Sequence, residues 1–343
     1  MEELQAEREV ELKLPKLEEK GMIIESEREI VSFEDVTKVY KTSGVKNFAL
    51  DHVTLNLEKG KALSIVGESG SGKTTLGLAS LGLLSLSGGS VKFHGKTISK
   101  MSRKEYREFR SKTHMIFQDP YSSLNPYNTI FRSVAAPLFS FHKEMSTGQI
   151  KEKVVDTLEK VGLSPGESYL DIYPRSLSGG QRQRVSIARA IINNPEFIVS
   201  DEATSMLDVS ITSTVINTLK MLKNEMGFSM LYISHEIATS RYLGDQMAVM
   251  NLGRVVEQGD PVDVTAKPMH PYTDLLISSF PKPGSKIVPS SKPIVPHNLV
   301  NGGIKGCTFA YMCKYKTEIC EKERPTLRML RPNHWVACFN PLA

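Results

Sequence analysis

A glycine-rich segment that ends in lysine and threonine is the first part of this sequence that could do chemistry. It directly follows the nearly all-apolar segment Ala62 to Val66, and it reads Gly67, Glu68, Ser69, Gly70, Ser71, Gly72, Lys73, Thr74, Thr75. In such a loop the glycines let backbone N–H groups turn toward phosphates, the lysine reaches the β and γ phosphates, and the threonine hydroxyl binds Mg2+. A plain glycine-serine turn is the alternative, but the position between a buried strand and a helix favours binding of a nucleoside triphosphate.

A pair of carboxylates, Asp201 and Glu202, ends the apolar segment that begins at Phe197. At the carboxyl edge of a parallel sheet such groups face the ligand crevice, where Asp201 can hold Mg2+ through water and Glu202 can orient the attacking water. Apolar strands that end in Asp-Glu are often only structural. Because this sequence also contains the phosphate-binding loop, we expect the catalytic interpretation to hold.

A second anion-binding pattern lies about a hundred residues after the first. It consists of five residues directly before a helix-periodic segment: Leu177, Ser178, Gly179, Gly180, Gln181. A glycine pair at a helix N-terminus offers free N–H groups and the positive end of the helix dipole, although a loop capped by Ser178 without any ligand is the alternative. Two phosphate sites in one small domain are redundant for one nucleotide. We therefore predict that they bind different nucleotides, shared across a head-to-tail dimer.

The elements that must position these groups alternate between strands and helices. The pattern predicts strands near 31–33, 50–57, 62–66, 197–200 and 230–234, a hairpin over 247–257, and helices over 150–161, 181–192 and 271–280. This alternation predicts an α/β fold with a phosphate-loop ATPase core, a helical subdomain and an antiparallel β element, followed by a small C-terminal cysteine-rich domain. We place a charged leader at 1–29, the ATPase domain at 30–260 with its helical subdomain at about 120–190, a helix and proline-rich linker at 261–300, and the cysteine domain, as a separate appendage, at 301–343.

Composition excludes several other classes of protein. The chain has 343 residues, 40% of them hydrophobic, so it is neither disordered nor fibrous. The net charge of +5 is uneven, because residues 1–30 hold 5 basic and 10 acidic side chains while residues 281–343 hold 10 basic and 3 acidic ones. No signal-peptide core opens the chain, and the longest apolar segment, Leu76 to Leu86, is shorter than the ~18 residues of a membrane span. We expect a cytosolic protein that works at a membrane only through other chains.

Taken together, the motifs resemble those of the ATPase subunits of ABC transporters. The resemblance implies that Leu177 to Gln181 is the signature motif, which acts in trans on ATP held by the partner's phosphate loop. It assigns adenine stacking to Tyr40, Mg2+ ligation to Gln118 beside Thr74 and Asp201, and the role of switch histidine to His235. It also implies that Ser205 through Asp208 form a dimer-crossing loop. Gln118 and His235 each close an apolar segment, which places them at the same predicted sheet edge as Asp201.

A narrower resemblance concerns the oligopeptide and dipeptide importers among these transporters. It is carried by the segment Ile116 to Pro126, by His270-Pro271-Tyr272-Thr273 and by four late cysteines, and other positions are more similar to the second of the two paired ATPase subunits. The resemblance implies a paralogous ATPase partner, two transmembrane permease subunits, an extracytoplasmic solute-binding protein reached through the permease, and a place at the cytoplasmic face of the cell membrane. Import of oligosaccharides stays open as an alternative cargo.

Two rival functions remain at this point. A soluble ABC-type ATPase acting on nucleic acid could use the basic tail, but it would favour paired ATPase domains or a zinc module, so we expect no nucleic acid partner. A non-hydrolysing regulatory module is disfavoured because Lys73, Asp201, Glu202 and His235 are all present.

Several positions depart from the family pattern. They are Ala203 where proline is usual, Met206 where alanine is usual, Glu236 in place of aspartate, and Arg175-Ser176 in place of His-Glu. None removes a phosphate, Mg2+ or base group, so hydrolysis is still expected.

All four cysteines, Cys307, Cys313, Cys320 and Cys338, lie in the last 37 positions. Their spacing lacks the close pairs of zinc ribbons, and disulfides are uncommon in cytosolic chains. Four thiolates can hold a [4Fe-4S] cluster at varied spacing, and the family resemblance implies that cluster. Buried cysteines without any ligand are the alternative.

Overall fold

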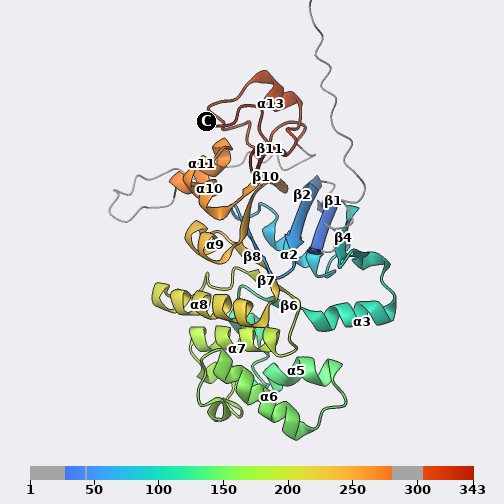
Figure 1. Cartoon of the computed structure of the whole chain (residues 1–343), viewed down its shortest axis with the longest axis vertical. Helices are drawn as coiled ribbons and strands as arrows, with labels where there is room; N and C mark the ends of the chain where they lie inside the picture. The colour runs from blue at the N-terminus through green and yellow to red at the C-terminus, as the bar shows by residue number, and fades with distance from the viewer. Residues whose placement is uncertain (1–27, 43–44, 280–303) are drawn as a thin grey trace, which may run out of the picture.

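The computed structural model describes residues 28–42, 45–279 and 304–343 (Figure 1). Almost all of the predicted leader and the whole of the proline-rich segment 281–296 lie outside the described residues. None of the helices in the described ranges is long and apolar enough to cross a membrane.

An eight-stranded sheet forms the centre of the fold, in the order β11-β12-β10-β9-β3-β8-β7-β6. Strands β9, β3, β8, β7 and β6 are parallel to one another, and the remaining pairs are antiparallel. The strands are β3 (Ala62–Val66), β6 (Thr113–Ile116), β7 (Phe197–Asp201), β8 (Ser229–Ser234), β9 (Gln246–Asn251), β10 (Arg254–Gly259), β11 (Arg328–Arg331) and β12 (His334–Val336). Every residue of β3, β7 and β8 is buried, as expected for parallel strands covered on both faces.

The two faces of this sheet pack against different layers. Alternate residues such as Phe197 and Val199 join a core with the antiparallel sheet and α2 (Lys73–Ser80), whereas Ile198 between them faces a second core shared with the helical subdomain. The antiparallel sheet has the order β2-β1-β4-β5, built from β1 (Glu29–Thr42), β2 (Val45–Glu58), β4 (Gly88–Phe93) and β5 (Lys96–Thr97). It is the antiparallel element that the sequence predicts, and β1 begins at Glu29, one residue earlier than expected.

The helical subdomain lies on the opposite side of the sheet, at the bottom of Figure 1. Its helices are α4 (Pro120–Ser123), α5 (Ile130–Phe141), α6 (Thr147–Lys160) and α7 (Gly179–Ile191), with short 3-10 turns at 166–169 and 174–176. Helices α6 and α7 start two to three residues earlier than their apolar periodicity predicts. The reason is a capping box at each start, in which Ser146 pairs with Gln149 and Ser178 with Gln181.

The remaining helices connect the strands and cover the ends of the sheets. They are the 3-10 turn Ile98–Lys100, α3 (Arg103–Lys112), α8 (Val209–Met226), α9 (Ile237–Leu243), α10 (Pro261–Ala266), α11 (Pro271–Ser278) and α13 (Glu318–Lys322). Helix α11 falls within the helix predicted over 271–280.

The expectation that the cysteine segment is a separate appendage is wrong. Strand β12 pairs with β10, so that Val336 lies opposite Glu257, and the C-terminal segment thereby extends the ATPase sheet. Asp51 of β2 accepts hydrogen bonds at 2.7 Å from both Arg254 of β10 and Arg324 of the C-terminal segment, and Arg254 also donates to the backbone oxygen of Gly306 at 2.6 Å. The proline-rich composition marks a break in the chain, but it carries no information on where the following strand pairs. Strand β12 covers an edge that would otherwise present unpaired backbone groups.

Candidate active site

The phosphate loop connects β3 to α2, and its glycines fit where no side chain would. A Cβ on Gly67 would lie 2.3 Å from the Met250 oxygen, and one on Gly72 would lie 2.2 Å from the Ala49 oxygen. Gly72, at φ +102°, is also the residue that caps the start of α2. The backbone of the loop is therefore packed closely against β2 and β9, and glycine at these positions is a steric requirement.

Lys73 is buried at the centre of this loop. Its Nζ donates hydrogen bonds to the backbone oxygens of Gly67 at 2.8 Å and Glu68 at 2.9 Å. Burial lowers the pKa of Lys73, while the nearby Glu202 and Asp201 carboxylates partly offset that effect. The Lys73 ammonium group is thus fixed by two carbonyls of the loop at the start of α2, where a helix N-terminus and a cation together favour phosphate.

Thr74 and Asp201 form the second part of the site. The Thr74 hydroxyl lies 3.2 Å from an Asp201 carboxylate oxygen, to which it donates a hydrogen bond. Burial raises the pKa of Asp201, and the hydrogen bond from Thr74 and the charge of Lys73 act against that rise. Paired oxygen ligands of this kind suit Mg2+, which uses few protein ligands beside the phosphates.

Side chains that follow three neighbouring strands, β6, β7 and β8, come together at Glu202. Gln118 follows β6 and donates a hydrogen bond from Nε2 to Glu202 Oε2 at 3.0 Å, while His235 follows β8 and places Nδ1 3.4 Å from the same oxygen. The Glu202 backbone has φ +43°, which is uncommon for a residue other than glycine and is typical of functional sites. The structure therefore brings together, at one edge of the sheet, the residues that the sequence predicts there: Gln118, Asp201, Glu202 and His235.

A cavity of about 340 Å3 opens in front of these groups. Its walls come from β1, β2, the phosphate loop and the carboxyl ends of β6 and β7, and the lining residues are Tyr40, Asn47, Ala49, Ser69, Gly70, Gly72, Lys73, Thr74, Thr75, Gln118 and Glu202. Tyr40 is 43% exposed, and Lys38 Nζ lies over its ring, 4.9 Å from the ring centroid, so a planar base would have to stack on the opposite face or displace Lys38. Asn47 and Ala49 lack any local sequence signal, because they reach the cavity only through the pairing of β2 with β1.

Three predicted members of the loop do not line this cavity. Gly67 and Ser71 form the base of the loop, where the backbone of Ser71 accepts a hydrogen bond from the Gly253 N–H at 2.9 Å. The Glu68 N–H donates to the hydroxyl of Tyr272 in α11 at 3.1 Å. The loop is thus tied to the C-terminal part of the chain on the side away from the cavity.

The signature residues lie at the start of α7, apart from this cavity. Ser178 accepts a hydrogen bond from the Gln181 N–H, and the Gln181 side chain accepts one from the Ser178 N–H. A Cβ on Gly180 would meet Ile211 of α8 at 2.6 Å, which explains the glycine by packing. None of the residues from Ser178 to Gln181 lines the cavity of their own chain. Asp208 is exposed and begins α8.

All four cysteines line a second, narrow cavity of about 10 Å3. Cys320 and Cys338 are buried, Cys307 and Cys313 are partly buried, and all four are free thiols. Burial raises the pKa of the Cys338 thiol to about 11, with a further contribution from the charges of the three other cysteines. Within the described ranges no group of three or more His, Cys, Asp or Glu side chains is arranged to hold one metal ion.

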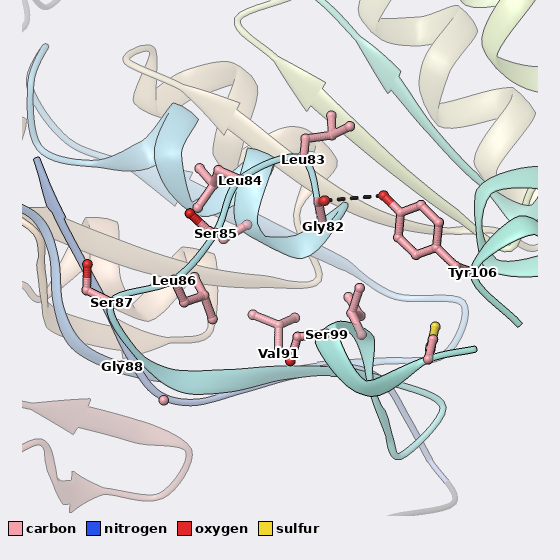
Figure 2. A pocket seen from close by; sticks show the side chains of 14 residues that line it. Gly82, Leu83, Leu84, Ser85, Leu86, Ser87, Gly88, Val91, Ser99 and Tyr106 are labelled. Atoms are coloured by element: carbon pink, nitrogen blue, oxygen red, sulfur yellow. Dashed lines mark hydrogen bonds between the residues drawn. The ribbon is translucent and has the colours of Figure 1, made fainter. Parts of the chain in front are cut away.

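A larger cavity of about 670 Å3 lies elsewhere, between the end of α2, β4 and α3 (Figure 2). Leu83, Leu84 and Leu86 line it, and the Tyr106 hydroxyl donates a hydrogen bond to the Gly82 oxygen at 3.3 Å across one end. Its lining contains no carboxylate, imidazole, thiol or ammonium group. Acid, base or metal chemistry therefore has no side chains to use there, and size alone does not make it the active site.

Three features define this fold and site as an ATPase of the ABC type. They are the phosphate loop after β3, the carboxylates at the end of the parallel strand β7, and the glycine pair at the capped start of α7. The family model of the ABC transporter matches residues 50–205, and that of the oligopeptide/dipeptide transporter C-terminal region matches residues 256–320. The chain belongs to the ATP-binding subunits of the oligopeptide/dipeptide importer family of ABC transporters. The family resemblance found in the sequence is thereby confirmed.

Individual relatives agree with this assignment. The chain is 40% identical over 301 residues to the oligopeptide transport ATP-binding protein OppF of Haemophilus influenzae, covering 86% of this chain and 89% of the relative. It is 38% identical over 334 residues to the oligopeptide transport ATP-binding protein AppF of Bacillus subtilis, covering 92% and 99%. Among solved structures, the dimeric ATP-binding cassette MJ0796 bound to ADP and Pi in a post-hydrolysis state matches with a TM-score of 0.62 and 31% identity, covering 68% of this chain and 99% of that one.

Proposed function

We propose that this protein hydrolyses ATP to power the import of oligopeptides or dipeptides. The observation that carries the proposal is the meeting of Gln118, Glu202 and His235 beside the phosphate loop, in a chain of the peptide importer family. Peptide uptake by cells with and without the gene tests the cargo. Uptake of oligosaccharides in place of peptides would contradict it and would support the alternative cargo.

Each group at the sheet edge has one role in this proposal. Lys73 and the loop N–H groups bind the phosphates, and Thr74, Asp201 and Gln118 hold Mg2+, which neutralises phosphate charge when bound. Glu202 orients the attacking water, and His235 contacts the γ-phosphate. Gln118 Nε2 donates to Glu202 Oε2 in this structure, and the amide oxygen of the same side chain is the atom that would bind Mg2+.

A Glu202→Gln variant tests the catalytic assignment. The amide keeps the shape of the side chain but cannot accept a proton from water, so we expect ATP turnover to fall roughly 100-fold or more while ATP stays bound. Glu236→Gln is the matched control, since Glu236 is a carboxylate next to His235 that does not line the cavity. Unchanged turnover in Glu202→Gln would remove Glu202 from the catalytic role.

The working unit in this proposal is a head-to-tail dimer with a paralogous ATPase. Ser178 to Gln181 cannot serve the ATP cavity of their own chain, because they do not line it, and the similar MJ0796 cassette is dimeric. We expect Ser178→Arg to prevent the ATP-bound dimer without weakening ATP binding to the isolated chain. Sedimentation of Glu202→Gln with ATP, with and without the paralogue, measures this. A dimer that forms equally well with Ser178→Arg would contradict the arrangement.

Permease subunits would place the protein at the cytoplasmic face of the membrane. Support comes from the family, together with the absence of a membrane-spanning helix from the ranges that the structure describes. The protein should sediment with membranes when two permease subunits are produced and should not when they are absent. Purification of the complex and identification of its chains would reveal the partner ATPase and the solute-binding protein.

A [4Fe-4S] cluster held by the four cysteines is the remaining part of the proposal. The donor set fits, because four thiols and no carboxylate line one cavity. The Phe309 N–H donates to Cys307 Sγ at 3.4 Å, and the backbones of Tyr315 and Asn340 make the same type of bond to Cys313 and Cys338. Three of the four sulfurs thus receive an N–H from the residue two positions later, which stabilises thiolate.

Among the described residues the four thiols line one narrow cavity, but they do not converge on one point as the ligands of a single metal ion do. Ligands of a single ion must converge on one point, whereas the thiolates of a cluster each bind a different iron and lie farther apart. The cysteine loops must move outward for the cluster to enter a cavity of this size. Anaerobically purified protein should contain iron and sulfide and absorb broadly near ~400 nm. Protein with neither would overturn the cluster.

A further inference from the structure

One buried nitrogen beside the cysteines has no hydrogen-bond partner among the described residues. This nitrogen is Nε2 of His270. His270 is 1% exposed and lines the cavity together with all four cysteines. Buried polar groups are almost always paired, so a single orphaned group in a cavity wall points to a partner that occupies the cavity.

The other ring nitrogen fixes the position of the proton. The Tyr272 backbone N–H donates to His270 Nδ1 at 3.0 Å, where His270 caps α11, so Nδ1 has to be the acceptor. A ring nitrogen that accepts a hydrogen bond carries no proton, so the ring is neutral and has one proton. That proton must sit on Nε2. The orphaned group is therefore an N–H donor that needs an acceptor.

We propose that His270 Nε2–H donates a hydrogen bond to a sulfur atom of the cluster site, either a cysteine thiolate or an inorganic sulfide. This hydrogen bond would tune the reduction potential of the cluster. The inference rests on the proposed cluster, and it assigns His270 a positioning and electrostatic role without making it a ligand. The four sulfur atoms are the most numerous side-chain acceptors in the lining, where the other polar side chains are Tyr315 and Asn340, and Asn340 itself lies with Nδ2 3.8 Å from Cys320 Sγ. A donor to sulfur favours the reduced cluster, which carries one more negative charge, and so raises the potential.

Two substitutions separate this role from helix capping. His270→Asn keeps an acceptor for the Tyr272 N–H but removes the donor toward the cavity. His270→Gln reaches the cavity with an amide N–H but loses the cap. His334→Gln is the control, because His334 is equally buried but bonds Glu257 at 2.7 Å and does not line the cavity.

The experiment is a redox titration of the full-length protein, purified anaerobically, with dithionite as electron donor and iron content measured on each sample. We expect a more negative midpoint potential in His270→Asn, equivalent to a reduced-to-oxidised ratio about fivefold to tenfold lower at a fixed potential. His270→Gln should lie nearer the wild type, and His334→Gln should equal it. An unchanged potential in His270→Asn with full iron content would overturn the inference, whereas a wild type without iron would overturn the cluster itself.

A measurement on the wild type covers the case in which the variants fail to fold. Electron-nuclear double resonance of the reduced protein, carrying 15N-labelled histidine, should detect a coupled ring nitrogen and a proton coupling that disappears in D2O. Iron-loaded protein without a coupled histidine nitrogen would overturn the hydrogen bond.

Discussion

The ATP cavity and the cysteine cavity are built on one sheet, yet they differ in access to solvent. The first has a volume of about 340 Å3, and Tyr40 in its wall is 43% exposed. The second has a volume of about 10 Å3 and is lined by two buried thiols, two partly buried thiols and aromatic rings. Open access suits a nucleotide that enters and leaves in every cycle. Enclosure suits a group that stays bound, because buried sulfur is shielded from oxidants and water.

A second difference is how the two sites are held. The active-site groups each follow a strand of the parallel sheet, so backbone pairing sets their spacing. The cysteine cavity depends on loops, which are anchored by the β10–β12 pairing and by Asp51, where Arg254 and Arg324 converge. One site is therefore supported by the core, and the other is supported by a small number of side chains at its margin.

The largest expected effect comes from Lys73→Ala, which should break one site and leave the other intact. Lys73 carries the only ammonium group among the described residues that line the ATP cavity, so its removal should reduce ATP turnover on the order of 10^2 to 10^3-fold. Iron content and cluster absorbance should not change, since Lys73 does not line the cysteine cavity. Both are measured on the same preparation. Loss of iron in Lys73→Ala would show that the two sites are not independent.

Asp51→Asn should damage the anchor that holds the cysteine segment against the ATPase sheet. Two guanidinium groups lose their common carboxylate in a largely buried place, which should destabilise the fold by about 3 kcal/mol. Urea unfolding, followed by circular dichroism, measures the change. Asp35→Asn is the control, because Asp35 pairs with His52 on the exposed surface and should cost less than about 1 kcal/mol. Equal losses in both variants would contradict the anchoring role.

The same carboxylate predicts how stability depends on pH. Burial opposes ionisation of Asp51, but Arg254 and Arg324 outweigh it, so its pKa lies below the usual 3.8. A lowered carboxyl pKa contributes stability that is complete above pH ~4 and is lost as pH falls through the folded-state value. Wild-type protein should therefore lose stability below pH ~4 more steeply than Asp51→Asn. Parallel acid-unfolding curves for the two proteins would argue against this contribution.

The two regions also differ in how far the sequence predicts them. The phosphate loop, Asp201, Glu202, Gln118 and His235 each adjoin an apolar segment, so local pattern and parallel pairing are enough to bring them together. The C-terminal sheet extension rests on β12, which has three residues and no usable periodicity. Its partner β10 is 75 or more residues earlier in the chain, and loop closure over that distance leaves no local signal. The capping boxes at Ser146 and Ser178 are visible in the sequence, but apolar periodicity alone misses the helix starts they create.

His270 and Tyr272 show a further limit of local pattern. The sequence His270-Pro271-Tyr272-Thr273 is recognisable as part of a family resemblance, but the side chains of His270 and Tyr272 contact different sites. His270 lines the cysteine cavity, whereas the Tyr272 hydroxyl accepts the Glu68 N–H of the phosphate loop. Only the packing of α11 between the two sites assigns these contacts. The Tyr272 ring, with its centroid 5.6 Å from that of Phe309, completes a path of contacts from Cys307 to the loop.

Tyr272→Phe should produce the smallest effect and is the sharpest test of that path. The change removes one hydroxyl that accepts the Glu68 N–H in a partly buried hydrogen bond and keeps the ring against Phe309. A lost hydrogen bond of about 1 kcal/mol should raise the KM for ATP roughly fivefold, while kcat and iron content stay near wild type. Tyr311→Phe is the matched control, because its ring also contacts Phe309 but no hydrogen bond joins its hydroxyl to the loop among the described residues. A lowered kcat with an unchanged KM would place Tyr272 outside the positioning of the loop, and equal KM values in all three proteins would mean that the two sites are joined only through the sheet.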